Sequence, residues 1–548
     1  MDSSRPTLGI YGIQDYLDTD YPQMVHDHNL ALINEGKVEN FLQLERITQI
    51  KRDNKMHQHI AGLVKEVNWV DKEMDVVFVD NMVGRAFISQ NGQIRFEAPL
   101  TKRLTKDWEE GRLWWFNREM NGYVLNHELA HVFSCLPFFG NFKENSLLIH
   151  FDGGASLSNF SAWMYRQEKI IPVEHHWELK HLTTLFNANA LTFGIIGSKI
   201  RDQNSVPGKL MGFAALGNYS ETIEFWLRQN KWFEDAWGKR SVFFERAKSD
   251  FNVDLKSFDQ HNTFLQDVVA TIQEVFMRET LMKIDDVNTL SNCKNLYYTG
   301  GCALNIQANS SLIESHLFDN IYIPPCTEDS GLALGAAAFG EWKKDHKFKP
   351  HSVFLNNWGI KQNEINYTNN DINEVAKLLS MGKVVGICNG YGEAGPRALG
   401  NRSLLAIPTK ALARKVSIIH KGREWYRPVA PVMLEENARY FTGLKEIHHL
   451  SKLMLLDFPI EQAKQNEIEG VIHANGTSRI QTIFDKEDNP FLYDLLTLLQ
   501  EQYNVKALIN TSFNRKGKPI IHTAEDALRE GHEMQIDAVV LNGKITLL

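Results

Sequence analysis

The sequence SLLIHFDGG at residues 146–154 carries the clearest fold signal in the chain. Its first six residues form an apolar run of strand length, and Asp152 then precedes two glycines. Such a run is typical of a buried strand that ends in a tight turn. Glycines at a strand end let backbone N–H groups approach a phosphate, and the aspartate can hold a metal ion or a hydroxyl. A tight turn without a ligand explains the same residues.

Two segments further along the chain resemble this pattern. Residues 297–305, YYTGGCALN, place a second glycine pair after an apolar run. Residues 324–337, PPCTEDSGLALGAA, place Asp329 before a helix of small residues. Two glycine pairs and two acidic residues at strand ends suggest a nucleotide cleft between two halves of a domain. The small-residue helix is otherwise simply a closely packed one.

The segments around these motifs alternate short apolar runs with helical periodicity. This alternation predicts an α/β architecture with mixed sheets. A hairpin is expected at residues 29–44, with its turn at 34–36. The other expected strands are 8–13, 75–79, 146–151 and 296–299, and the expected helices include 56–67, 121–133 and 264–284.

A change of composition marks a domain boundary. A charged run at residues 343–350 ends in proline, and residues 363–373 are rich in asparagine. Few contacts cross such segments, so we expect a first domain at 1–350, a linker at 351–370 and a second α/β domain at 371–548.

Composition limits the class of protein. The chain has 548 residues, which at roughly 100–200 residues per domain means two to four domains. A net charge of −8 argues against bulk nucleic-acid binding, although a local basic phosphate site remains open. No apolar run approaches the ~20 residues of a membrane span, and the start of the chain does not resemble a signal peptide. The five cysteines are scattered. We therefore expect a cytoplasmic protein with no membrane or nucleic-acid partner.

The string HELAH at residues 127–131 allows two interpretations. His127 and His131 are four residues apart, so a helix presents both on one face, where they can bind one metal ion. With Glu128 between them, the HExxH pattern is that of a zinc metalloprotease. A helix with two hydrogen-bonded histidines is the other interpretation.

Arginine recurs among glycine, asparagine, serine and threonine near the C-terminus. Arginine forks bind phosphate oxygens bidentately, and hydroxyl and amide groups complete such a shell. A single arginine near a glycine is more often part of a structural ion pair. Several such segments together predict an oxyanion or phosphate site. They are residues 392–403 (GEAGPRALGNRS), 421–431 (KGREWYRPVAP), 473–482 (HANGTSRIQT) and 509–520 (INTSFNRKGKPI).

These segments resemble the signature segments of the NodU/CmcH carbamoyltransferase family, which includes nodulation-factor, cephamycin, tobramycin and ansamycin O-carbamoyltransferases. The N-terminal half agrees in the family's order, from about residue 8 onward. The matching segments there are HDHN at 26–29, LERITQIK at 44–51, PGKLMGFA at 207–214, and the HELAH, FDGG, TGGCALN and EDSGLALGAA strings.

The resemblance implies an actin/Hsp70-like N-terminal domain and a YrdC-like C-terminal domain. It implies an ATP-dependent enzyme that makes carbamoyl-adenylate from carbamoyl phosphate and ATP in the C-terminal domain. The carbamoyl group then passes to a hydroxyl of a small-molecule acceptor in the N-terminal domain, as in antibiotic or other secondary-metabolite biosynthesis. The sequence does not identify the acceptor, whether a sugar or another natural product. A homodimer is expected from the family alone.

The resemblance also implies the roles of individual residues. His26 would be the general base, and Lys51 would lie near the acceptor. A divalent metal, Fe²⁺ by the family's precedent with Mg²⁺ as an alternative that accompanies ATP, would be held by His127, His131, Asp152 and Asp329. The nucleotide would contact Gly153, Gly154, Gly300, Gly301 and Asn305. Carbamoyl phosphate or the adenylate would be held by Arg397, Lys421, Arg423, Arg427, Arg479, Asn510 and Asn514.

The chain departs from the family pattern at a few positions. Residues 12–25 are an insertion before His26, His28 and Asn29 replace Ala-Ser, and Asn475 replaces an aspartate. None of these changes removes a proposed ligand. The alternatives are a HExxH zinc metalloprotease and a catalytically inactive nucleotide-binding relative.

Overall fold

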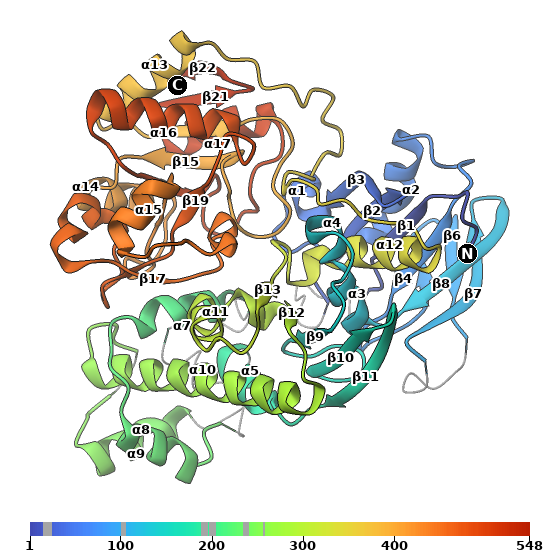
Figure 1. The fold of residues 1–548 in the computed structure, drawn as a ribbon, viewed down its shortest axis with the longest axis horizontal. Helices are drawn as coiled ribbons and strands as arrows, with labels where there is room; N and C mark the ends of the chain where they lie inside the picture. Colours follow the sequence, from blue (N-terminus) through green and yellow to red (C-terminus); the bar gives the residue numbers. More distant parts are fainter. Residues whose placement is uncertain (15–24, 100–105, 188–195, 197–203, 234–239, 256–257) are drawn as a thin grey trace.

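In the computed structural model, the described residues form three main sheets, each accompanied by helices (Figure 1). In the part of the chain that the structure describes, these sheets are accompanied by one short two-stranded sheet, β17 (Phe458–Pro459) with β18 (Thr477–Ser478). The described residues are 1–14, 25–99, 106–187, 196, 204–233, 240–255 and 258–548.

The first sheet has the strand order β3-β2-β1-β4-β8-β7-β6-β5. Strand β2 pairs antiparallel with both β1 and β3, whereas β4 pairs parallel with both β1 and β8. The strands are β1 (Thr7–Tyr11), β2 (Asn29–Asn34), β3 (Lys37–Gln43), β4 (Asp75–Val79), β5 (Phe87–Ile88), β6 (Ile94–Glu97), β7 (Trp108–Trp115) and β8 (Arg118–Leu125).

The second sheet repeats the first five positions of this pattern. Its order is β11-β10-β9-β12-β13, with β10 antiparallel to β9 and β11, and β12 parallel to β9 and β13. This duplicated arrangement confirms the expected actin/Hsp70-like fold. The strands are β9 (Ser146–Phe151), β10 (Phe160–Arg166), β11 (Lys169–His176), β12 (Asn295–Thr299) and β13 (Asn320–Tyr322).

Helix α12 (Leu332–Lys343) is the small-residue helix of the sequence, and it packs against β1 and α3 (His127–Phe133). A Cβ at Gly335 would overlap the carbonyl oxygen of Ala130, so only glycine permits this approach. Close packing of α12 therefore brings the start of α12 beside the HELAH helix.

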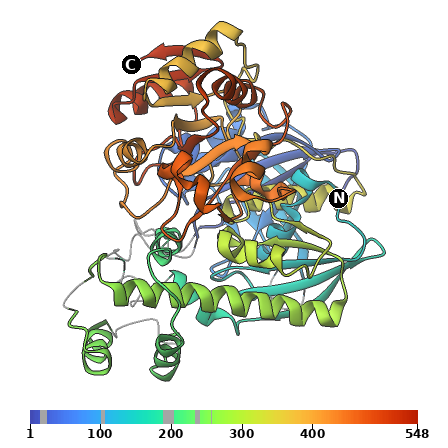
Figure 2. The ribbon, with the colours of Figure 1, turned by 60° about the vertical axis from the view of Figure 1, so that its left-hand side comes forward.

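A layer of helices covers the face of the second sheet that is opposite α3. The long α10 (Thr263–Ser291) runs along this face (Figure 2). Glu279 on α10 ties this layer together, because its Oε2 lies 2.8 Å from His181 Nε2 and its Oε1 accepts a hydrogen bond from Arg228. Burial alone raises the pKa of Glu279, but these hydrogen bonds outweigh it and lower the pKa to about 2. The other helices of the N-terminal half are α1 (Leu44–Thr48), α2 (Met56–Glu66), α4 (Leu136–Phe139), α5 (Lys180–Asn187), α7 (Val206–Ala214), α8 (Glu221–Gln229), α9 (Arg240–Phe251) and α11 (Ile306–Glu314).

The third sheet belongs to the C-terminal part of the chain and has the order β19-β16-β20-β15-β14-β21-β22. Between Lys343 and Asn369 the chain forms neither a helix nor a strand of a sheet. The YrdC likeness and the exact boundaries at 350 and 371 stay predictions. The strands of this sheet are β14 (Val385–Cys388), β15 (Arg402–Ala406), β16 (Ala430–Leu434), β19 (Gln481–Ile483), β20 (Leu508–Ser512), β21 (Ala538–Leu541) and β22 (Lys544–Leu547). The helices of this part are α13 (Asn369–Ser380), α14 (Lys410–Arg414), α15 (Glu435–Thr442), α16 (Pro490–Tyr503) and α17 (Ala524–Met534).

The expected hairpin and the strands at 75–79, 146–151 and 296–299 are confirmed, with bounds within one or two residues. The helix expected at 121–133 is wrong in its first part, because residues 118–125 pair with β4 and β7 as strand β8. A short apolar run does not distinguish a buried strand from a helix, and here the neighbouring strands decide. Most of the insertion at 12–25 lies outside the described residues. Among the helices described, none has the length and apolar character to cross a membrane.

Candidate active site

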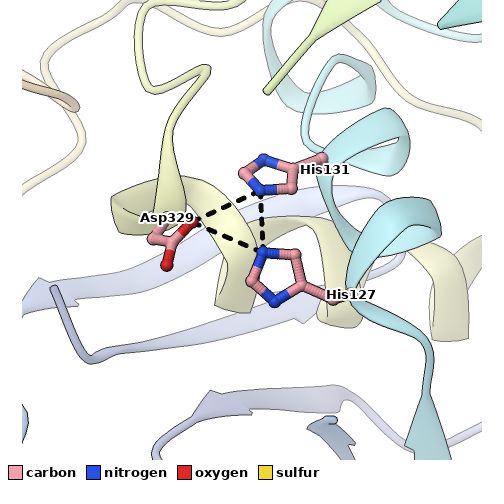
Figure 3. Close-up of side chains that lie close together, drawn as sticks. All are labelled: His127, His131 and Asp329. Carbon is pink, nitrogen blue, oxygen red and sulfur yellow. Dashed lines mark hydrogen bonds and ion pairs between the residues drawn. The ribbon is translucent and has the colours of Figure 1, made fainter. Parts of the chain in front are cut away.

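The two histidines of the HELAH string converge on Asp329 (Figure 3). Helix α3 begins after Asn126, whose side chain accepts a hydrogen bond from the Leu129 backbone N–H and so fixes the first turn. His127 Nε2 and His131 Nε2 lie 3.1 Å apart, and each is 3.4 Å from Asp329 Oδ1. The structure thus joins a helix and a turn that are about 200 residues apart in the sequence.

This triangle has the dimensions of a metal site. Two ligand atoms that are each about 2.1 Å from one cation lie about 3.0–3.4 Å apart in octahedral or tetrahedral geometry. All three side chains are buried, and the Nδ1 atoms of His127 and His131 have no hydrogen-bond partner in the described structure. Imidazole and carboxylate together suit a transition-metal dication such as Fe²⁺ or Zn²⁺. The donor set therefore fits the expected metal.

Asp152, the fourth expected ligand, lies at the edge of this cluster. Its Oδ2 is 3.9 Å from His131 Nε2 and accepts a hydrogen bond of 2.5 Å from the Gly301 N–H. The backbone of Gly300 has φ 94° and lies against the carbonyl oxygen of Phe151, where a Cβ would clash. The glycine pair after β12 therefore positions the aspartate that follows β9.

Two residues that the sequence analysis did not single out as ligands or partners hold Asp329 in place. The hydroxyl of Tyr11 donates to Asp329 Oδ2 at 2.9 Å, which leaves Oδ1 directed at the histidines. The Asn29 amide donates to the Asp329 backbone carbonyl at 2.9 Å, and its oxygen accepts from the Ala333 N–H at 2.7 Å. The chain spacing of these residues gives no signal of either contact, because sheet packing creates both.

His26, the expected base, borders the same cluster. Its Nδ1 lies 2.9 Å from Asp27 Oδ2 and 3.8 Å from Asp329 Oδ2. Burial by itself lowers the pKa of His26, but the two carboxylates outweigh it and raise the pKa to about 9. The two carboxylates therefore favour the protonated form of His26 in the free protein.

One cavity of about 1240 Å³ extends from this cluster to the arginine-rich segments of the C-terminal part. His26, Asp152 and Asp329 line one region, and the arginines of the signature segments line another. Of the expected nucleotide contacts, Gly153, Gly301 and Asn305 line the cavity. A Cβ at Gly154 would instead meet Met82 and Trp177. Asn305 also caps α11 and exchanges hydrogen bonds of 3.0 and 3.1 Å with Gln273.

The arginine cluster carries more positive than negative charge, although Arg427 forms an ion pair of 3.6 Å with Glu424. Burial and the neighbouring guanidinium groups, that of Arg479 first, hold the pKa of Arg397 well below its ordinary value. The same causes lower the pKa of Arg423 to about 9 and that of Arg479 to about 10. Because a guanidinium keeps its proton in proteins, the mutual repulsion has to be offset by an anion. The cavity-lining members of the expected carbamoyl-phosphate set are Arg397, Arg423, Arg427, Arg479, Asn510 and Asn514.

Lys421 differs from these arginines. It is 1% exposed, and its ammonium group donates to the Ser512 carbonyl oxygen and, at 2.7 and 2.9 Å, to the backbone and side-chain oxygens of Asn514. The Lys421 charge is therefore used to hold the turn after β20. This geometry favours support of the anion site over direct contact with a ligand.

Lys51 lines the cavity, and its Nζ forms an ion pair of 3.0 Å with Glu45 Oε2. Three basic residues of the INTSFNRKGKPI segment, Arg515, Lys516 and Lys518, also line the cavity. The sequence analysis quoted this segment but assigned no role to these three side chains. Their place in the segment was the available signal.

Glu128 is directed into a loop. One carboxylate oxygen, Oε1, accepts hydrogen bonds from the backbone N–H groups of Leu157 (2.6 Å) and Ser158 (3.0 Å). Burial raises the pKa of Glu128 to about 7. A carboxylate engaged in this way supports the loop after β9, and its geometry gives no support to the metalloprotease alternative.

The two actin/Hsp70-like sheets share one cavity with the arginine-rich α/β part. The fold and the site therefore define a two-part α/β protein whose cavity joins an arginine cluster to a His-His-Asp cluster. Comparison with known proteins makes the class specific. The chain belongs to the carbamoyltransferase family, so it is a transferase by family: the model of the carbamoyltransferase N-terminus matches residues 116–338, and that of the C-terminus matches residues 376–547.

Curated relatives align over most of the chain. Nodulation protein NolNO of Sinorhizobium fredii is 26% identical over 94% of this chain and 78% of its own length. Nodulation protein U of Sinorhizobium fredii is 26% identical over 93% of this chain and 96% of its own length. Among solved structures, full-length HypF in a phosphate- and nucleotide-bound form has a TM-score of 0.33 at 10% identity, covering 62% of this chain and 55% of HypF.

Proposed function

We propose that the protein is an ATP-dependent carbamoyltransferase that makes carbamoyl-adenylate from carbamoyl phosphate and ATP and transfers the carbamoyl group to a hydroxyl of a small molecule. The cavity shared by the arginine cluster and the His-His-Asp cluster is the observation that supports this proposal. A sugar or another natural product is the proposed acceptor class, as in the nodulation proteins' family. The chemistry balances when carbamoyl phosphate, ATP and water give carbamoyl-adenylate, phosphate and pyrophosphate.

The arginine cluster is proposed to hold the anionic substrates. Carbamoyl phosphate is a small dianion, and four guanidinium groups around one region of the cavity offset its charge. Asn510 is held there by hydrogen bonds from its amide to the Ala398 carbonyl (3.2 Å) and the Gln481 side chain (2.5 Å). Burial of the adenylate within this cavity would also limit its hydrolysis.

Transfer is proposed at the other region of the cavity. The acceptor oxygen attacks the carbamoyl carbon, and AMP leaves with the bonding electrons. The neutral form of His26, which is the minority at pH 7 because its pKa is about 9, takes the hydroxyl proton. A divalent cation held by His127, His131, Asp152 and Asp329 would neutralise charge on the adenylate phosphate. Lys51 borders this region and is the proposed contact of the acceptor.

Two partial reactions test the proposal with different variants. Carbamoyl-phosphate-dependent exchange of labelled pyrophosphate into ATP reports adenylate formation, and AMP release with added acceptor reports transfer. We expect wild-type protein with Mg²⁺ and Fe²⁺ to support both, Arg397→Met to lose both, and His131→Ala to remove only AMP release. Exchange that is independent of carbamoyl phosphate would contradict the proposal. No turnover with any acceptor would favour the inactive nucleotide-binding relative.

A further inference from the structure

His150 is a third histidine beside the proposed metal site. It lies within the SLLIHFDGG segment, but no role has been assigned to it so far. It lies in β9, two residues before Asp152. Because side chains alternate along a strand, residues two apart share a face, so the strand itself aims His150 and Asp152 in the same direction. His150 is fully buried, at 0% exposure.

The His150 ring has no hydrogen-bond partner in the described structure. Both ring nitrogens, Nδ1 and Nε2, are buried and lack a hydrogen bond. A neutral imidazole carries one donor and one acceptor, and buried polar groups are rarely left unpaired. An unpaired imidazole in the interior therefore calls for another kind of partner.

The surroundings of His150 are those of a ligand cluster. Its ring centroid is 5.0 Å from that of His131, at an interplanar angle of 30°, and 6.3 Å from that of His127. One ligand atom each from His131, His150 and Asp152 can be chosen so that all three lie within 4.8 Å of one another. His131 also belongs to the triangle with His127 and Asp329 (Figure 3), so the two groups share a residue.

We propose that His150 is a further ligand of the cation in this site, which makes the set three imidazoles with carboxylates. This inference rests on the proposed function, because the cation is part of that proposal. Two ligands at about 2.1 Å from one ion are at most about 4.2 Å apart. Binding therefore requires the ligand atoms of His131, His150 and Asp152, which lie within 4.8 Å of one another, to come within that limit. Three imidazoles favour Fe²⁺, Co²⁺ or Zn²⁺ over Mg²⁺, which prefers oxygen ligands. The site would therefore keep a transition metal in the presence of the Mg²⁺ that accompanies ATP.

Cobalt binding to the full-length protein tests His150 without any substrate. The variants are His150→Phe, which keeps a flat ring but offers no ligand, and Tyr298→Phe as the matched control. Tyr298 is also fully buried with an unpaired hydroxyl, and it lies on the neighbouring strand β12 opposite Ile149. The measurements are Co²⁺ stoichiometry, the dissociation constant by competition with a chelator, and the visible spectrum of the bound Co²⁺.

We expect the wild type and Tyr298→Phe to bind one Co²⁺ per chain with the same spectrum in excess Mg²⁺. His150→Phe is expected to bind at least tenfold more weakly, with a changed spectrum. Equal affinity and an unchanged spectrum in His150→Phe would overturn the role of His150 while leaving the proposed cation site intact. No Co²⁺ binding by the wild type would overturn the cation site and His150 together. If His150→Phe does not fold, X-ray absorption of Co²⁺-loaded wild type decides by the number of imidazole ligands, three against two.

Discussion

Arg397 offers a test in which ligand affinity and stability change in opposite directions. Its guanidinium lines the cavity, its Nε has no hydrogen-bond partner in the described structure, and its Nη2 reaches only the Leu304 carbonyl at 3.4 Å. Burial and then the nearby guanidinium groups hold its pKa well below the ordinary value, so its charge is unfavourable in the free protein. Arg397→Met keeps a long side chain and removes the charge.

The loss of affinity follows from the worth of a charge-assisted hydrogen bond. One such bond contributes about 1.5–3 kcal/mol, so we expect carbamoyl phosphate to bind about 10- to 150-fold more weakly. At a concentration of 100 times its dissociation constant, the ligand stabilises the wild type by about 2.7 kcal/mol. A variant that binds 100-fold more weakly gains only about 0.4 kcal/mol at that concentration. At about 2–4 °C per kcal/mol, the ligand-induced rise in Tm falls from roughly 5–11 °C to about 1 °C.

Thermal melts with and without carbamoyl phosphate measure both effects. In buffer without multivalent anions, we expect Arg397→Met to melt at a higher temperature than the wild type, because the repulsion is relieved. The control is Arg439→Met, since Arg439 is about half exposed and its Nε lies 3.7 Å from Glu435 on the same helix. The control should keep the full ligand-induced rise in Tm. An unchanged ligand response in Arg397→Met, or a lower Tm without ligand, would refute the assignment of an anion site to these arginines.

Three further variants test the packing that supports the site. Gly335→Ala should lower stability by about 1–3 kcal/mol or more in urea unfolding, because the added methyl group overlaps α3. The control Gly62→Ala has open space at its Cβ in the middle of α2 and should raise stability by about 0.5–1 kcal/mol. Equal effects of the two substitutions would contradict the close approach of α12 to α3. Lys421→Met should lower Tm by the equivalent of about 1–3 kcal/mol, because the buried oxygens of Asn514 lose their hydrogen-bond donor. This change is opposite in sign to that expected for Arg397→Met. A rise in Tm would instead indicate that the Lys421 charge binds a ligand. Glu279 has a folded-state pKa near 2, below its unfolded value, so its stabilising effect is present above about pH 4.5 and is lost as the pH falls toward 2. Glu279→Gln should therefore flatten the acid limb of the stability–pH curve, whereas Asp285→Asn, at an exposed position of the same helix, should leave it as in the wild type.

The strands of the site were predictable because their signals are local. The apolar run at 146–151, the glycine pair after it and the hairpin at 29–44 depend on neighbouring residues, and each lies where the sequence places it. The error at 121–125 arose where a local pattern is ambiguous and pairing with β4 and β7 decides the outcome. A period of two cannot be recognised in a run that is buried on both faces.

By itself the sequence determined the histidine pair of α3 and the resemblance to the carbamoyltransferases, which also names Asp329. Helical geometry alone puts His127 and His131 on one face, and the ordered signature segments need no coordinates. Only the tertiary structure decided the 3.4 Å distances from Asp329 to both histidines, that Lys421 supports a turn and that His150 faces the same cluster. Those facts depend on α12 packing against α3 and on β9 lying beside β12, contacts between residues far apart in the chain. Long-range packing fixes distances that no local spacing encodes.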